Sequence, residues 1–169
     1  MDLSNWKSEI VDIDSLRPHP RNPRIHPESL IKKLEKSIAE FGWSNPVIAT
    51  EDGLVLAGHA RITAAKNMGI SRVPVVRLPI NGDKANAYLI ADNRIAEESE
   101  WDRGILKDIL LDLDHGAFDL ELTGFSLGEV EEMMTAAPPN FLPGTEEEQG
   151  RLDQKKPVVC PKCSHEFTT

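Results

Sequence analysis

The chain of 169 residues is 40% hydrophobic and 28% charged, which is typical of a globular protein with its own core. No segment approaches the roughly 18 to 20 consecutive apolar residues that span a bilayer. Residues 1–10, MDLSNWKSEI, also lack the layout of a secretory signal. We therefore expect a cytoplasmic protein with no membrane partner. The net charge of −9 argues against a surface that grips nucleic acid on all sides.

The charges are unevenly distributed along the chain. Residues 17–77 carry ten Lys or Arg against five acids, whereas residues 92–132 carry thirteen acids against three bases. A positive site in the first half of a negative protein fits this distribution. Solvated faces that happen to sort this way explain most of the charges equally well. Arg24 and Arg61 stand out because each lies close to Gly or Pro residues.

The first expected elements are a strand, a loop and a helix. Residues 8–14 alternate polar and apolar positions and predict a half-buried strand. Three prolines then force an extended loop over residues 17–27. The next segment predicts a helix between Pro27 and Gly42. The apolar side chains on one stripe of this helix are Leu30, Ile31, Leu34, Ile38 and Phe41.

A tight β-hairpin and a second helix are expected next. Residues 46–50 and 54–57 predict the two strands of the hairpin, joined by Glu51-Asp52-Gly53. Residues 59–68 predict a short Ala-rich helix, which Gly69 closes.

One more strand and three helices complete the expected elements. The strand at 73–78 contains Pro74, which favours an edge of the sheet or the first position of a strand. The helices are expected at 82–96, 102–114 and 126–135. The order of elements predicts an α+β fold, in which a small mixed β-sheet packs with helices and an acidic helical extension follows.

Composition divides the chain into four segments. The α+β domain is expected over residues 8–100 and the helical extension over residues 101–136. Residues 137–157 combine Pro, Gly and a Glu triplet and predict a disordered linker. The remaining residues, 158–169, form a polar tail with both cysteines of the chain.

The tail resembles one knuckle of a zinc ribbon. In Cys160-Pro-Lys-Cys163, two thiolates at this spacing can hold one side of a tetrahedral Zn²⁺, with His165 as a third candidate ligand. A closed site needs four ligands, so a complete one would require His115 or a partner chain. Exposed thiols without a metal are the alternative. Two cysteines so close together cannot form the disulfide framework of a small secreted domain.

A candidate anion site lies where the strand at 54–57 passes through Gly58 into a helix. The first backbone N–H groups of such a helix are unpaired and attract phosphate. Gly58 lets an anion approach the backbone closely. His59 can donate from a ring nitrogen, and Arg61 offers a fork that matches phosphate oxygens. A solvated turn without a ligand is the alternative.

Four motifs, in order, resemble the ParB/sulfiredoxin superfamily. They are L-R-P-H-P-R-N-P-R (16–24), F-G-W-S-N-P-V-I (41–48), V-L-A-G-H-A-R-I-T-A-A (55–65) and A-D-N-R (91–94). The chain looks closest to the ParB-like N-terminal (nuclease-like) domains of phages and mobile elements, many of which are fused to DNA methyltransferases. The resemblance implies the ParB/sulfiredoxin-like fold over residues 10–101 and a nucleotide as ligand.

The resemblance also implies roles for two segments. In the partition proteins of this superfamily, the segment corresponding to 42–46 lies along the base and ribose of CTP. This implies nucleoside contacts from Asn45 and Pro46. The segment corresponding to Gly58, His59, Ala60 and Arg61 cradles the triphosphate in those proteins.

Further contacts are implied by a loop and by a later helix. An acidic-Asn-x-x-Arg helix supplies metal and phosphate contacts in the partition proteins, which implies roles for Asp92, Asn93 and Arg94. The nucleotide would carry Mg²⁺. Arg24 lies in a loop that the family folds toward the nucleotide, so it is a further candidate for a phosphate contact. His19 and His26 of the same loop are expected at the surface.

The sequence departs from both branches of the superfamily. Partition proteins have Gln at the position of Asn45 and a Gly-Glu-Arg-Arg turn, so CTP and ATP both stay open. Sulfiredoxins carry a catalytic cysteine where this chain has His59, which sets sulfinic-acid reduction aside. A DNA-reading helix-turn-helix is not expected, because only about 35 residues, acidic in overall composition, separate Trp101 from the linker. No methyltransferase is expected either, because Pro138-Pro139-Asn140-Phe141 lacks an accompanying Gly-rich cofactor loop.

Three hypotheses follow. The first is an NTP–Mg²⁺-binding protein of phage or mobile-element DNA metabolism, accessory to a DNA-modifying enzyme. The second is an enzyme that uses the same pocket, a nuclease, a phosphotransferase or an NTP hydrolase, in which His59 or Asp92 aligns the attacking group against a γ-phosphate. The third is an adaptor that docks a partner through its acidic helices and its tail, with a vestigial nucleotide site that stays empty. The candidate partners are a nucleotide, DNA, a DNA-modifying enzyme and a second copy of the chain.

Overall fold

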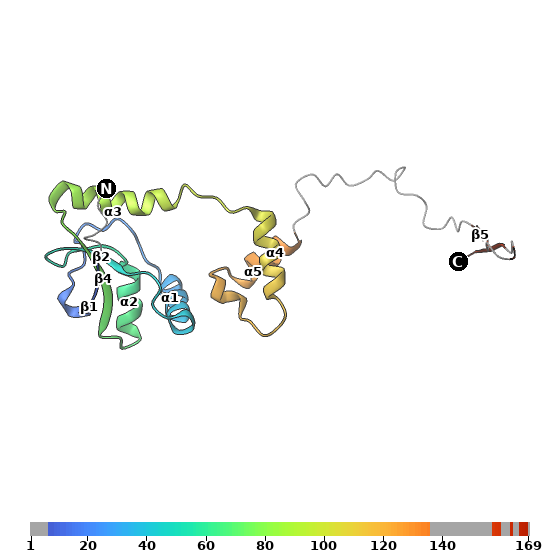
Figure 1. Cartoon of the computed structure of the whole chain (residues 1–169), viewed down its shortest axis with the longest axis horizontal. Helices are drawn as coiled ribbons and strands as arrows, with labels where there is room; N and C mark the ends of the chain where they lie inside the picture. The colour runs from blue at the N-terminus through green and yellow to red at the C-terminus, as the bar shows by residue number, and fades with distance from the viewer. Residues whose placement is uncertain (1–6, 136–156, 160–162, 164–165, 169) are drawn as a thin grey trace. The chain divides into compact units, whose positions relative to one another are not determined.

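The computed structural model describes residues 7–135, 157–159, 163 and 166–168. The chain divides into one compact unit that ends at Met134 and a second that begins at Thr135 (Figure 1). Within the described residues, no helix is long and apolar enough to cross a membrane. The elements of the first unit are β1 (Ser8–Asp12), η1 (Ile13–Ser15), α1 (Glu28–Phe41), β2 (Val47–Thr50), β3 (Val55–Ala57), α2 (His59–Asn67), β4 (Arg72–Leu78), α3 (Gly82–Ala96), α4 (Arg103–Leu113), η2 (Leu120–Thr123) and α5 (Leu127–Thr135).

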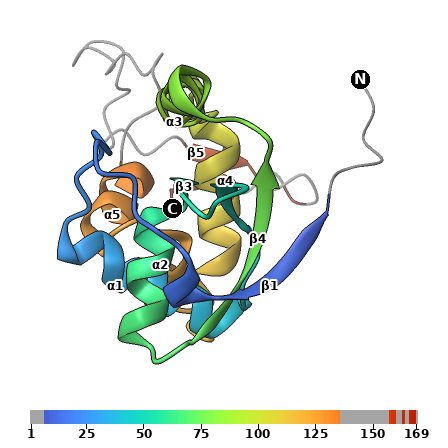
Figure 2. The same ribbon diagram turned by 90° about the vertical axis from the view of Figure 1, so that its left-hand side faces the viewer.

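A four-stranded mixed sheet forms the centre of the first part of this unit. Its strand order is β1-β4-β2-β3. Strand β4 pairs antiparallel with β1 and parallel with β2, while β2 and β3 form the predicted hairpin. Parallel strands need a crossover, and α2 supplies it between the hairpin and β4, as Figure 2 shows. The predicted α+β class and mixed sheet are therefore confirmed.

The core of the sheet consists of small β-branched residues and alanines. Val47, Val55, Val73 and Val75 are completely buried. Side chains from η1, from the residue that caps it and from α2 close this core: Ile13, Leu16, Ile62 and Ala65. Burial of this apolar surface drives the packing of α2 against the sheet and so fixes where α2 begins.

One expectation about this domain is wrong. Pro74 does not lie at an edge, because β4 runs between β1 and β2. The parallel ladder with β2 starts only at Val75, so Pro74 faces β1 alone, opposite Ile10, and lies beyond the end of β2. Along the apolar stripe of α1, Ile31 is buried, whereas Phe41 is 56% exposed. It is the last residue of α1, before Gly42 ends the helix with a φ of 74°.

The helices at the end of this unit have their own small core. Leu110, Leu120 and Val130 are buried together, one each from α4, η2 and α5. The Asp102 carboxylate accepts hydrogen bonds from two N–H groups of α4, and so caps its N-terminus. Ser126 and Glu129 form a capping box at the start of α5. These caps explain why the bounds predicted for the two helices agree with the structure within one residue.

Two lysines of α1 contact these later helices. The Lys36 ammonium lies 2.6 Å from a carboxylate oxygen of Glu121 in η2. The Lys33 ammonium donates to the carbonyl oxygen of Gly124, at the same distance of 2.6 Å. The aromatic rings of Trp101 and Phe125 meet edge to face, with centroids 5.8 Å apart.

The second unit contains one described hairpin. Strands β5 (Pro157–Val159) and β6 (Glu166–Thr168) pair antiparallel, with Val158 opposite Phe167. Cys163 lies between them in the sequence and is an exposed, free cysteine. The predicted linker, Cys160 and His165 lie outside the described residues.

Candidate functional site

The turn between β3 and α2 has the geometry that its sequence predicts. Gly58 lies in the left-handed region, with φ 95° and ψ 16°. A side chain there would be strained, and its Cβ would lie 3.3 Å from Cγ2 of Val47 on the neighbouring strand. The absence of a side chain therefore brings the start of α2 close against the sheet.

The N-terminus of α2 is open to an anion. Its N-cap, Gly58, has no side chain that could accept a hydrogen bond. The first internal bond of the helix runs from the N–H of Ile62 to the carbonyl of Gly58. Within the described residues, no acceptor contacts the N–H groups of His59, Ala60 or Arg61. Unpaired N–H groups and the positive end of the helix dipole together favour phosphate at this position.

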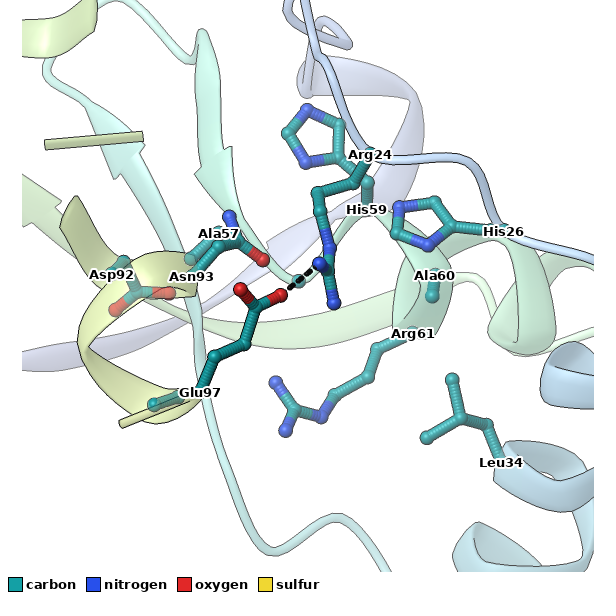
Figure 3. Close-up of a pocket in the computed structure, with 12 residues that line it drawn as sticks. Arg24, His26, Leu34, Ala57, His59, Ala60, Arg61, Asp92, Asn93 and Glu97 are labelled. Atoms are coloured by element: carbon teal, nitrogen blue, oxygen red, sulfur yellow. Dashed lines mark hydrogen bonds and ion pairs between the residues drawn. The ribbon is translucent and has the colours of Figure 1, made fainter. Parts of the chain in front are cut away.

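A pocket of about 340 Å³ opens over this helix terminus. Its walls come from the loop before α1, from α1 itself, from the turn at Gly58 and from the last turns of α3 (Figure 3). The lining residues are Arg24, His26, Leu34, Ala57, Gly58, His59, Ala60, Arg61, Asp92, Asn93, Ala96 and Glu97.

The structure brings together most of the residues proposed from the sequence. Seven of them line this pocket: Arg24, Gly58, His59, Ala60, Arg61, Asp92 and Asn93. Asn45 and Pro46 are not among the lining residues. They lie just before β2, where Asn45 is exposed and Pro46 is partly buried.

Arg94 also lies outside the lining. Its guanidinium is 3.4 Å from a carboxylate oxygen of Glu98, and 61% of its side chain is exposed. Residues three and four apart share a helix face, so Asn93, Ala96 and Glu97 face the pocket together and Arg94 does not. In the acidic-Asn-x-x-Arg pattern, the arginine stands three residues after the asparagine, and here that position is Ala96.

Five lining residues were not proposed from the sequence: His26, Leu34, Ala57, Ala96 and Glu97. Glu97 matters most, because its Oε1 forms an ion pair with Nη1 of Arg24 (Figure 3). A helical projection from Asn93 would have found Glu97, since it lies four residues further along α3.

The loop before α1 is tied to the turn by histidines. The backbone N–H of His19 donates to Nε2 of His59, at 3.3 Å. The backbone N–H of Arg21 donates to Nδ1 of His19, at 3.2 Å. The expectation that His19 is a surface residue is wrong, because only 8% of it is exposed. His59 therefore positions the loop that carries Arg24.

Burial sets the protonation of these imidazoles. Burial, with smaller effects of His26 and His19, lowers the pKa of His59 to about 4. His59 is thus neutral at pH 7, which agrees with its role as acceptor from the His19 N–H. Burial and then the charge of Arg24 lower the pKa of His26. Nε2 of His26 is buried and has no hydrogen-bond partner among the described residues.

The α3 side of the pocket is polar. The Tyr88 hydroxyl lies 3.4 Å from Oδ1 of Asp92, and the Asn93 amide donates to the Leu89 carbonyl at 2.8 Å. Burial, followed by the Asp92 charge, raises the pKa of Tyr88. The pocket therefore combines two arginines and a helix N-terminus on one side with the carboxylates of Asp92 and Glu97 on the other.

No group of three or more His, Cys, Asp or Glu side chains able to hold a metal ion occurs within the described residues. Of the three tail residues of the predicted zinc site, Cys160, Cys163 and His165, only Cys163 lies within the described residues. The zinc site stays a prediction.

Comparison with known sequences identifies the family. Residues 2–93 match the ParB N-terminal domain. The chain belongs to this family. Residues 104–161 match a second family, the ParB-methyltransferase HTH domain. The expectation that a helix-turn-helix is absent is therefore wrong. It rested on the short, acidic segment between Trp101 and the expected linker, whereas the matched residues extend to 161 and the apolar positions Leu110, Leu120 and Val130 form one core.

Several relatives share the first part of the chain. The ParB-like nuclease domain-containing protein YnaK of Escherichia coli K12 is 39% identical over 66 residues, which are 39% of this chain and 76% of that protein. Stage 0 sporulation protein J of Bacillus subtilis is 34% identical over 80 residues, or 45% of this chain and 28% of that protein. The chain therefore spans most of YnaK but less than a third of this larger relative.

A solved structure shares the fold. The C-terminally truncated chromosome-partitioning protein ParB of Caulobacter crescentus, complexed with CTP-γ-S, matches 76% of this chain and 77% of its own. The TM-score is 0.61 and the sequence identity 21%. At this identity, the similarity shows the fold of the protein.

Proposed function

We propose that this ParB-family chain binds a nucleoside triphosphate in the pocket over α2, with CTP as the first candidate. The observation that carries the proposal is the open N-terminus of α2, whose three unpaired N–H groups face a pocket that also contains Arg24 and Arg61. The Caulobacter relative with the same fold was solved with a CTP analogue, which supports CTP over ATP.

Each side chain has a defined part in this proposal. Gly58 lets the phosphates approach the backbone. Arg61 is a free fork for phosphate oxygens, because its side chain has no ion-pair or hydrogen-bond partner in the part of the chain that the structure describes. Arg24 would supply a second cation. Asp92 and Asn93 would face the Mg²⁺ that accompanies the triphosphate, since carboxylate and amide oxygens suit this ion.

The nucleoside contacts are assigned from the family. Asn45 and Pro46 lie at the start of β2, outside the pocket lining, so the base and ribose would extend beyond the phosphate pocket toward them. Arg94 receives no phosphate contact in this proposal, because it faces away from the pocket and pairs with Glu98.

We further propose that nucleotide binding serves a DNA-modifying system. The support is the helix-turn-helix domain of the ParB-methyltransferase type that follows the nucleotide domain. A DNA-binding surface needs cations, yet residues 92–132 carry thirteen acids against three bases. This imbalance favours a second candidate role for the same helices, an adaptor surface that docks a partner enzyme.

The first experiment measures the melting temperature with CTP, ATP, GTP and ADP, each with Mg²⁺, for the wild type and Arg61→Ala. Only a ligand that binds the folded state raises the melting temperature. We expect the largest shift with CTP, and a loss of about 10- to 100-fold in affinity in Arg61→Ala, because a charged hydrogen bond contributes about 1.5–3 kcal/mol. Absence of a shift with every nucleotide would refute the proposal.

Two further assays separate the remaining hypotheses. Phosphate release or DNA nicking by the wild type that disappears in Arg61→Ala would support the hydrolase or nuclease hypothesis, with His59 or Asp92 as the catalytic residue. Retention of zinc after dialysis, lost in Cys163→Ser, would support the zinc site of Cys160, Cys163 and His165.

A further inference from the structure

The ion pair between Arg24 and Glu97 joins two walls of the phosphate pocket. Arg24 comes from the loop before α1, and Glu97 caps the C-terminus of α3. Both line the pocket, and Figure 3 shows the Glu97 carboxylate beside the Arg24 guanidinium. The pair therefore lies where the proposed ligand would bring its own negative charge.

This pair is weakly held by its surroundings. The side chains are 49% and 47% exposed, and ion pairs this exposed to solvent typically add little to stability. The bonds that position the loop involve other groups, the His19 and Arg21 backbone N–H groups. The pair can therefore open without unfolding the loop.

The chemistry of the two partners decides what can open it. A guanidinium binds carboxylate and phosphate with the same fork of N–H donors. Arg61, the other arginine of the pocket, has no such acidic partner among the described residues. The Arg24 guanidinium is already paired with a carboxylate of the protein, whereas the Arg61 guanidinium is available to an anionic ligand.

We infer that Glu97 is an internal competitor of the ligand phosphate and so a determinant of nucleotide affinity. Its carboxylate occupies on Arg24 the place that a phosphate oxygen takes when the nucleotide binds. Binding exchanges one anion for the other on the Arg24 guanidinium. This inference rests on the proposed function.

A bracing role for Glu97 makes the opposite prediction. If Glu97 only holds Arg24 in the right place for the ligand, its removal weakens binding. If it competes, its removal strengthens binding. The sign of one affinity change therefore distinguishes the two roles.

The experiment is calorimetric titration of the full chain with CTP and Mg²⁺. The variants are Glu97→Gln, Arg24→Ala and the two combined. Glu98→Gln is the matched control. It removes a neighbouring carboxylate that also pairs with an arginine, Arg94, but Glu98 does not line the pocket. We expect Glu97→Gln to bind about fivefold more tightly, the factor for an exposed pair of about 1 kcal/mol. Glu98→Gln is expected to bind like the wild type.

The double variant tests the route of the effect. In an Arg24→Ala background, Glu97→Gln is expected to change the affinity by less than about twofold, because there is no guanidinium left to release. Unchanged or weaker binding by Glu97→Gln, while the wild type binds CTP, would overturn the inference and leave the proposed function intact. If neither the wild type nor Glu97→Gln binds any nucleotide, the inference and the proposed function are both overturned.

Discussion

The two parts of the first unit differ in what holds them together and in what they can bind. The nucleotide part has a sheet core of completely buried valines and a pocket with two arginines. The helical part, α4 to α5, has three buried side chains and a strongly acidic sequence. A small core gives little redundancy, so single substitutions should matter more in the helical part. Ligand effects, in contrast, should be confined to the nucleotide part.

The largest expected effect is that of Leu110→Ala. Leu110 is 1% exposed and lies at the centre of the helical core. Truncation of a buried leucine costs about 2–4 kcal/mol, as transfer energy and cavity are lost together. We expect α4 and α5 to lose stability while CTP binding stays within about twofold of the wild type. Circular dichroism during urea titration measures the loss of stability, and calorimetric titration measures the affinity for CTP. A loss of CTP affinity comparable to the loss of stability would show that the two parts do not behave independently.

The next largest effect is expected for Gly58→Ala, in the nucleotide part. The left-handed φ of 95° strains any side chain, and the new Cβ would press on Val47 at 3.3 Å. We expect a loss of about 2–3 kcal/mol in the free energy of unfolding, together with loss of CTP binding. Gly69→Ala is the matched control, because its φ of 71° is similarly strained but nothing lies within 4 Å of its Cβ position. Gly69→Ala should lower the free energy of unfolding by only about 1 kcal/mol. Equal losses in the two variants would mean that the contact between the new Cβ and Val47 has no effect on stability.

The bounds of the later helices were predictable because local signals set them, whereas the strand expected over residues 8–14 ends at Asp12. Prolines, glycines and capping residues act within a few positions, which is why α3, α4 and α5 begin and end where the sequence indicates. The place of β4 in the sheet was not predictable in this way. Strand order depends on which distant strands pair, and the rule for Pro74 describes only the missing N–H, not the length of the neighbouring strand.

The residues of the pocket also differ in how far they could be predicted from local sequence. The turn from Gly58 to Arg61 is contiguous in the sequence, so its chemistry could be proposed from the sequence. The Arg24–Glu97 pair joins residues 73 positions apart, and neither residue type signals its partner. The helix-turn-helix was not predicted, because the segment before the expected linker is short and acidic, whereas the fold is set by the spacing of its apolar residues. Charge tells what a surface can attract, not how the chain beneath it folds.

A smaller effect is expected on lowering the pH. The pKa of His59 falls from 6.5 to about 4 on folding, so the unfolded chain binds a proton first as the pH drops. The contribution of His59 to the free energy of unfolding is therefore complete above pH 6.5 and is lost as the pH falls toward 4. After allowance for solvent screening, we expect a loss of about 1–2 kcal/mol. Urea unfolding between pH 7 and 4.5 measures it.

Replacement by asparagine isolates this contribution. His59→Asn should flatten the acid limb of the stability curve, whereas His115→Asn, in the exposed turn after α4, should not. The same acid limb in all three proteins would assign the loss to other groups. CTP should also raise the pKa of His59, because phosphate favours the imidazolium. Binding should therefore take up protons in this pH range, which calorimetry in buffers of different ionisation enthalpy detects.

The smallest effect is expected where the two parts touch. Lys36 lies on α1, whose Leu34 lines the pocket, and pairs with Glu121 of η2. The Glu121 hydrogen bond raises the pKa of Lys36, but the pair is exposed and screened by salt. Lys36→Ala should lower the urea midpoint only slightly, and about 0.5 M NaCl should abolish the difference from the wild type. Lys32→Ala, which removes a pair within α1 itself, is the control. A large, salt-independent loss in Lys36→Ala alone would mean that this contact holds the helical part to α1 as firmly as a core does.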